Sequence, residues 1–164
     1  MMDNYFLSLD YSPEHLLSIM YEEASVAENY YMSPAKVLRC DVSLFLRKEL
    51  TKLINAPFTC CGFLKTPPLY IYPIHTDVFR IASINMPVFE ETVGFQSYMY
   101  TDNKLEPIDY RTNNFTLLNV MKPHGIENKN PERERLMLSI GFKNHSYNTL
   151  REMHYNGELI NVAV

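Results

Sequence analysis

The sequence Tyr72-Pro73-Ile74-His75-Thr76-Asp77 stands among short apolar and aromatic runs. In an extended strand, residues two apart project from the same side, so His75 and Asp77 present an imidazole and a carboxylate from one face. Their backbones would then lie about 7 Å apart, which is close enough for both side chains to reach one ion. The stretch therefore predicts a strand that carries two ligands of a single metal ion.

A second stretch supplies a third donor. It reads Lys122-Pro123-His124-Gly125-Ile126-Glu127-Asn128, and His124 lies 47 residues after Asp77 (124 − 77). Two histidines and one carboxylate leave about three positions of an octahedron open, which is the arrangement of non-haem iron(II) oxygenases. The open positions admit a bidentate oxo-acid and O₂ together. We therefore expect iron(II) at His75, Asp77 and His124.

Two arginines follow the second histidine, in the charged run Glu132–Arg135. Arg135 leads the apolar run Leu136–Phe142, and a guanidinium there can hold a carboxylate near the metal through two parallel hydrogen bonds. Arg133 competes for the same role. We favour Arg135 because an apolar run follows it directly, as a core strand should. A solvated charge run is the alternative interpretation of both arginines.

This order of residues resembles the 2-oxoglutarate- and iron(II)-dependent oxygenase superfamily, whose pattern is His-x-Asp, a long gap, a distal histidine and then an arginine or lysine. Residues 80–88 and 119–128 look most like the small phage-type or aspartyl/asparaginyl hydroxylase branch. The resemblance spans roughly Leu69 to Phe142. It implies a double-stranded β-helix, or jelly roll, with iron(II) and 2-oxoglutarate as cofactors and Arg135 holding the C5 carboxylate. It also implies hydroxylation of a substrate, with decarboxylation of 2-oxoglutarate to succinate.

Three asparagines near these motifs are candidate site or structural residues. Asn85 and Asn119 can hydrogen-bond the cosubstrate, or they can hold the site together. Asn128 can cap a turn after His124.

The rest of the chain predicts a mainly β fold with N-terminal helices. A helix is expected over Asp41–Ile54, with Asp41 as its cap, and another is expected to start at Ser12-Pro13-Glu14. A short helix is possible near Ser146–Tyr155. The expected strands are Cys61–Lys65, Leu69–His75, Phe79–Val88, Phe95–Thr101, Phe115–Lys122 and Arg135–Phe142. We expect one domain over residues 1–164, with a mostly helical part, residues 1–57, packed on a sheet.

Composition narrows the function classes. The net charge of −4 argues against a nucleic-acid partner that is bound through bulk positive charge. The chain has no pattern of a signal peptide and no apolar run long enough to span a bilayer, which requires roughly 20 residues. Its three cysteines, Cys40, Cys60 and Cys61, form a poor disulfide framework and favour a reducing, cytoplasmic location. The substrate is expected to be a small molecule or a protein side chain, which the sequence does not identify.

Other functions remain open at this point. One is a metal-binding jelly roll of the cupin kind without oxygenase activity, which would not need the arginine. Another is a noncatalytic interaction or virion-assembly domain, which would not need three metal ligands. A nucleobase demethylase is disfavoured, because the second arginine that this group usually carries on its last core strand would fall at Gly141.

Overall fold

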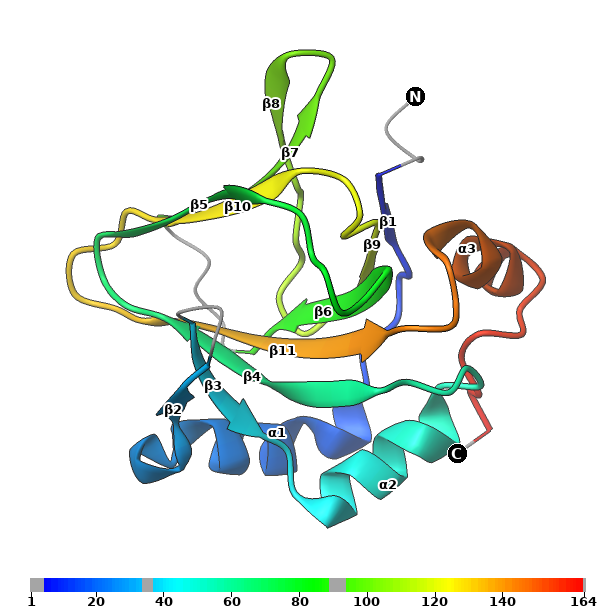
Figure 1. Ribbon diagram of the computed structural model, residues 1–164. Helices are drawn as coiled ribbons and strands as arrows, with labels where there is room; N and C mark the ends of the chain where they lie inside the picture. The colour runs from blue at the N-terminus through cyan, green and yellow to red at the C-terminus, as the bar shows by residue number, and fades with distance from the viewer. Residues whose placement is uncertain (1–4, 34–36, 89–93, 164) are drawn as a thin grey trace.

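The computed structural model describes residues 5–33, 37–88 and 94–163, and it consists of two antiparallel sheets that face each other (Figure 1). The larger sheet has seven strands in the order β1-β9-β6-β11-β4-β3-β2, and the smaller has four in the order β5-β10-β7-β8. The strands of the larger sheet are β1 (Phe6–Ser8), β9 (Thr116–Leu118), β6 (Ala82–Pro87), β11 (Arg135–Phe142), β4 (Cys60–Thr66), β3 (Leu38–Asp41) and β2 (Tyr31–Met32). Those of the smaller sheet are β5 (Tyr70–His75), β10 (His124–Asn128), β7 (Phe95–Thr101) and β8 (Lys104–Pro107).

Strand β11 lies at the centre of the larger sheet, between β4 and β6. Its side chains alternate, as expected for a strand with a different environment on each face. Leu138, Ile140 and Phe142 are completely buried in the main hydrophobic core. Arg135 and Met137 line the space between the two sheets instead. One face of β11 thus holds the core together, while the other faces the cavity between the sheets.

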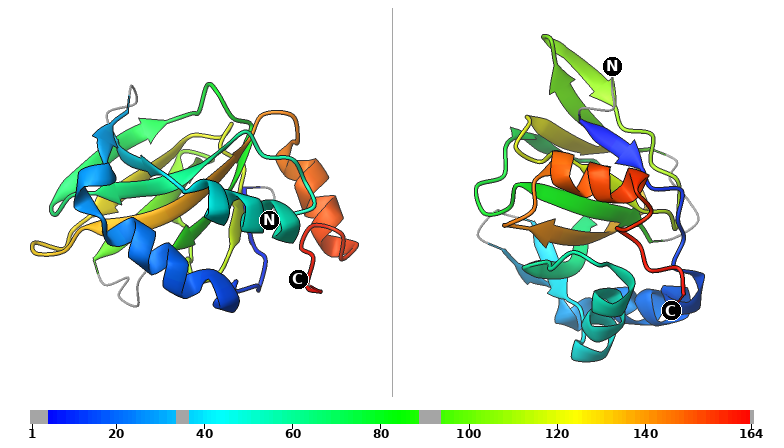
Figure 2. Two further views of the ribbon diagram at one scale, coloured as in Figure 1. Left: turned by 90° about the horizontal axis from the view of Figure 1, so that it is seen from below. Right: turned by 90° about the vertical axis from the view of Figure 1, so that its right-hand side faces the viewer.

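The N-terminal helices cover the outer face of the larger sheet, as predicted (Figures 1 and 2). Helix α1 (Leu17–Ser25) follows a short 3-10 helix, η2 (Glu14–Leu16), and is followed by another, η3 (Ala27–Asn29). Helix α2 (Leu44–Leu53) buries three leucines in the same core as the sheet. The predicted helical part also supplies strands β1, β2 and β3, which were not predicted because they have only two to four residues each.

The predicted helix caps need correction in two places. Helix α2 is capped by Ser43, whose side chain accepts a hydrogen bond from the backbone nitrogen of Leu46, whereas Asp41 is the last residue of β3. At the first helix, Pro13 occupies the N-cap position of η2 without any side-chain cap, so Ser12 does not act as one. The third helix is confirmed as α3 (Tyr147–Tyr155), with Ser146 as its cap.

The strand predictions are accurate where apolar residues alternate over a long run. Strands β7 and β11 have the predicted limits, whereas β6 begins at Ala82 rather than Phe79 and β9 ends at Leu118 rather than Lys122. Strands β8 and β10 were not predicted, because the sequences KLEP and HGIEN are mostly polar. No helix in the described part of the chain is long and apolar enough to span a membrane.

Candidate metal centre and cosubstrate pocket

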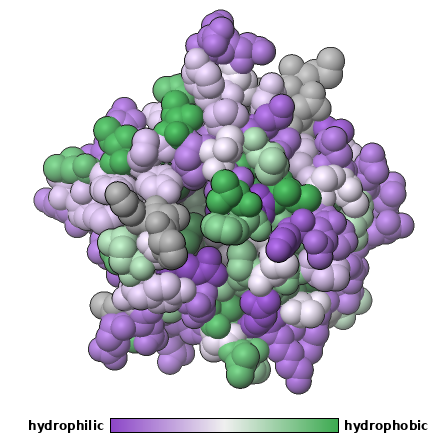
Figure 3. All heavy atoms as spheres, in the orientation of Figure 1, coloured by the Kyte–Doolittle hydropathy of each residue, from purple (hydrophilic) through white to green (hydrophobic). Residues whose placement is uncertain are grey.

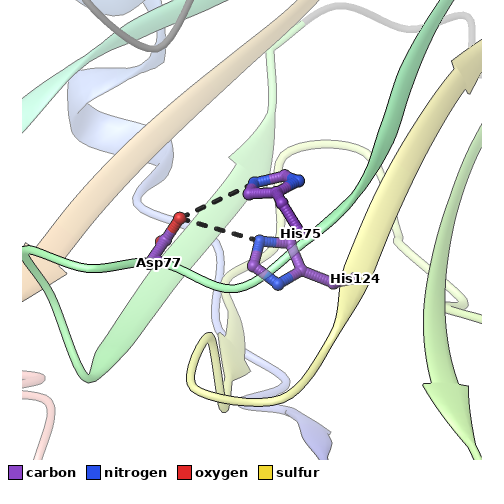
Figure 4. Close-up of side chains that lie close together, drawn as sticks. All are labelled: His75, Asp77 and His124. Carbon is purple, nitrogen blue, oxygen red and sulfur yellow. Dashed lines mark ion pairs between the residues drawn. The ribbon is translucent and has the colours of Figure 1, made fainter.

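His75, Asp77 and His124 converge at one end of the smaller sheet (Figure 4). One potential ligand atom from each residue lies within 4.8 Å of the other two. Oδ1 of Asp77 is 3.7 Å from Nε2 of His75 and 4.0 Å from Nε2 of His124. The two imidazole rings lie with their centroids 4.4 Å apart. Three donors of suitable type therefore surround a space in which a divalent ion could be bound.

Two different elements of local structure bring these donors together. Strand β10 pairs with β5 in antiparallel register, and this places His124 directly opposite His75. Asp77 lies beyond the end of β5, where its backbone nitrogen donates a hydrogen bond to the carbonyl of Val120 at 3.0 Å. The expectation that His75 and Asp77 project from one continuous strand is therefore wrong. A turn after β5, held by Val120, brings the carboxylate to the histidines.

Backbone carbonyls orient both imidazole rings. Nδ1 of His75 lies 2.9 Å from the carbonyl oxygen of Pro73, and Nδ1 of His124 lies 2.9 Å from that of Lys122. A carbonyl oxygen only accepts, so Nδ1 carries the hydrogen in each ring and Nε2 keeps its lone pair. Burial lowers the pKa of His124, which favours the neutral, metal-binding form at neutral pH. These features fit a metal bound through both Nε2 atoms and one carboxylate.

Arg135 lies deep in the space between the sheets, with only 4% of its surface exposed. Its Nη2 donates a hydrogen bond to Oγ of Ser97 at 2.7 Å, and its Cζ lies 5.6 Å from the ring centroid of Tyr110. Burial lowers the pKa of Arg135 from its ordinary value, and the neighbouring Tyr110 raises it by a smaller amount. A guanidinium nevertheless stays protonated in proteins, so the structure places a positive charge in this pocket.

The other predicted cosubstrate residues lie in different places. Arg133 is exposed and lines a separate cavity, whose wall Arg135 shares. Asn85 lines the metal cavity, where its Nδ2 donates to the hydroxyl of Tyr110 at 3.3 Å. In the described part of the chain, Asn119 is not on the wall of that cavity. Its backbone carbonyl instead accepts from the nitrogen of Lys122, in the turn that leads to His124.

Asn128 fixes the loop between His124 and Arg135. Its buried side-chain amide donates to the carbonyls of Thr66, Pro67 and Arg133, at 3.2, 2.8 and 2.9 Å. Its Oδ1 accepts from the backbone nitrogen of Asn130. The predicted turn-capping role is therefore confirmed, and the same side chain ties the start of β11 to the end of β4.

Replacing Asn128 by alanine is expected to lower the free energy of unfolding by about 1–3 kcal/mol, because buried carbonyls lose their donor. Urea unfolding of the metal-free protein measures this change. Asn55→Ala is the control, since Asn55 is exposed and makes one hydrogen bond, to the carbonyl of Glu158. An equal effect of the two substitutions would contradict the structural role of Asn128.

One cavity contains both the metal donors and Arg135. Its volume is about 950 Å³, and its wall is mostly apolar. Figure 3, in the orientation of Figure 1, shows the molecule hollowed between the two sheets, with hydrophobic side chains beside the opening. Val78 and Phe79 line this cavity directly after Asp77, and each is 83% exposed. Tyr31 and Met32 are further exposed apolar residues on its wall.

Four residues of this site were not predicted from the sequence: Ser97, Tyr110, Arg80, which donates a hydrogen bond to Asp77, and Ser139, which accepts one from Arg80. Arg80 follows Asp77 by three residues, and this spacing was the only signal available in the sequence. Ser97 and Ser139 stand on inward-facing positions of predicted strands, which their neighbours could have indicated. Tyr110 lies in an irregular segment after β8, and no pattern points to it.

Comparison of the fold with solved structures agrees with the family resemblance of the sequence. No family model and no curated protein matches the sequence. A prolyl-4-hydroxylase from Pseudomonas putida superposes with a TM-score of 0.63 and 16% identity, over 88% of this chain and 96% of its own. The chain has the fold of the 2-oxoglutarate- and iron(II)-dependent oxygenases. The predicted jelly roll is thereby confirmed, while the phage-type or aspartyl/asparaginyl branch stays a prediction.

Two further neighbours share this oxygenase fold. HygX from Streptomyces hygroscopicus, solved with nickel and 2-oxoglutarate bound, has a TM-score of 0.56 and 11% identity, over 89% of this chain and 86% of its own. A viral collagen prolyl hydroxylase from Paramecium Bursaria Chlorella virus-1, in complex with 2-oxoglutarate, has a TM-score of 0.56 and 12% identity, over 84% and 94% of the two chains. A protein with nickel and 2-oxoglutarate bound and a collagen prolyl hydroxylase therefore share the fold of this chain.

Proposed function

We propose that the protein is an oxygenase that depends on iron(II) and 2-oxoglutarate and hydroxylates a small molecule or a protein side chain. His75, Asp77 and His124 would bind the metal, and Arg135 would hold the C5 carboxylate of 2-oxoglutarate. The proposal joins the predicted motif, the convergence of three donors and the fold shared with oxygenases that bind 2-oxoglutarate.

The observation that carries the proposal is the buried charge of Arg135. Among residues 5–33, 37–88 and 94–163, no carboxylate forms an ion pair with this guanidinium. An uncompensated buried charge is costly, so a site that keeps one is suited to an anionic ligand. A dicarboxylate held at one end by the metal and at the other by Arg135 would satisfy both groups.

The residues of the chain have separate tasks in this proposal. Bound iron(II) would supply the oxidative chemistry, in which O₂ is activated while 2-oxoglutarate loses CO₂ to give succinate. The Pro73 and Lys122 carbonyls hold the two imidazoles in their metal-binding tautomer. Ser97 and Tyr110 fix the guanidinium of Arg135, so that the cosubstrate meets a preformed partner. The apolar wall of the cavity restricts access of water to the reacting groups.

The rival functions fit these observations less well. A cupin-like metal site would use the three donors but has no need of a buried guanidinium in the same cavity. An interaction or virion-assembly domain needs neither the three metal donors nor the buried guanidinium. Gly141 leaves no space for the second arginine of a nucleobase demethylase, since even a Cβ atom there would lie 2.5 Å from Sγ of Cys60.

Conversion of 2-oxoglutarate to succinate is the direct test of the function. The protein with iron(II) and O₂ is assayed first alone and then with a panel of amino acids, peptides and small metabolites. A chelator should stop any turnover. If the iron-loaded protein fails to bind 2-oxoglutarate at all, the proposed function is wrong.

A further inference from the structure

Arg80 joins the metal-binding carboxylate to the larger sheet. Its Nε donates a hydrogen bond to Oδ2 of Asp77, and its Nη1 donates another to Oγ of Ser139 at 2.6 Å. Ser139 stands on the cavity face of β11, in line with Arg135 and Met137. One guanidinium therefore bridges the turn after β5 and the central strand of the opposite sheet.

The hydrogen bonds continue from Ser139 to the cosubstrate pocket. Oγ of Ser139 donates to Oδ1 of Asn85 at 2.8 Å, and Nδ2 of Asn85 donates to the hydroxyl of Tyr110 at 3.3 Å. The ring of Tyr110 in turn lies beside the guanidinium of Arg135, with 5.6 Å between the ring centroid and Cζ. Four side chains, those of Arg80, Ser139, Asn85 and Tyr110, thus link the carboxylate of Asp77 to the pocket of Arg135.

A glycine on β11 leaves space for Arg80. A Cβ atom built on Gly141 would lie only 2.9 Å from Cδ of Arg80. Any larger residue at this position would push Arg80 or the neighbouring Cys60 aside. Gly141 is therefore part of the arrangement. Because Gly141 has no side chain, the guanidinium of Arg80 can pass β11 and reach Asp77.

We propose that Arg80 is a positioning residue, which holds Asp77 as a ligand through one oxygen only. This inference rests on the metal centre of the proposed function. With Oδ2 bound to Arg80, only Oδ1 faces Nε2 of the two histidines. A carboxylate that is free to rotate could bind a metal through both oxygens and occupy a position that the cosubstrate needs. Arg80 would thus favour metal binding and keep the position for 2-oxoglutarate open.

The test compares metal binding by Arg80→Ala, Arg80→Lys and a matched control. The control is Arg39→Ala: the Arg39 side chain is 21% exposed, against 20% for Arg80, lines the same cavity and pairs with a carboxylate, Asp41, at 2.8 Å. Asp41 is not among the metal donors. Calorimetric titration with nickel(II) alone measures affinity, and circular dichroism checks the fold of each variant.

We expect Arg80→Ala to bind nickel about 10–100-fold more weakly than the parent, in the range seen when a partner of a metal ligand is removed. Arg80→Lys should recover part of this loss, because an ammonium keeps the charge but cannot reach Asp77 and Ser139 together. Arg39→Ala should bind nickel like the parent. The visible absorption of the anaerobic iron(II) and 2-oxoglutarate complex should also change in Arg80→Ala and not in the control.

Two negative results have different meanings. If the parent binds nickel but Arg80→Ala binds it equally well, or Arg39→Ala loses as much affinity, the role of Arg80 is overturned and the proposed function is not. If the parent itself binds no divalent metal, the proposed function falls, and the role of Arg80 falls with it. A folded Arg80→Lys variant with impaired binding supports the role even if Arg80→Ala does not fold.

Discussion

Replacing His75 or Asp77 by alanine is expected to abolish stoichiometric binding of iron(II). Each residue supplies one of the three donor atoms that lie within 4.8 Å of one another, and a site with two donors binds a divalent ion far more weakly. Equilibrium dialysis under anaerobic conditions, followed by metal analysis, measures the bound iron. The expected result is close to one iron per parent chain and little in either variant.

The control for this loss is His15→Ala, because His15 is exposed on the 3-10 helix η2 and, among the residues that the structure describes, belongs to no cluster of metal donors. It should bind iron like the parent. Nickel, zinc or manganese can replace iron in the measurement, since imidazole and carboxylate ligands suit several divalent metals. Iron binding that persists in both His75→Ala and Asp77→Ala would show that the metal centre is wrongly assigned.

Replacing Arg135 by alanine is expected to weaken 2-oxoglutarate binding by about 2–5 kcal/mol, with metal binding little changed. The physical reason is that a buried carboxylate needs a charged partner, and a guanidinium provides two parallel donors that cannot deprotonate. The affinity for 2-oxoglutarate is measured anaerobically with iron(II) present. Unchanged iron binding in the same sample shows that the pocket has not collapsed.

Arg133→Ala provides the comparison for Arg135→Ala. Arg133 is exposed and lines a different cavity, so its removal should change 2-oxoglutarate affinity little. A loss confined to Arg133→Ala would transfer the anchoring role to that residue. No loss in either variant would remove the main argument for 2-oxoglutarate and leave a metal-binding jelly roll.

Hydrophobic periodicity and the order of the polar residues predict part of the fold and the class of the site. Alternation along residues 135–142 predicted both the limits of β11 and the faces of its side chains, because a strand has a period of two. The order of His75, Asp77, His124 and Arg135 indicated the class of site, because each residue type is restricted to a few chemical roles. The predicted iron ligands are the donors that the fold brings together.

The way in which these side chains are held depends on tertiary contacts. Asp77 reaches the histidines through a turn bound to Val120, and no local pattern encodes a hydrogen bond between residues so far apart. The depth of Arg135 compared with Arg133 depends on how the two sheets face each other. The hydrogen bond from Arg80 to Ser139 joins residues 59 positions apart, and it requires that residue 141 has no side chain. Such contacts arise from packing between strands that are far apart in the sequence, so the sequence pattern does not predict them.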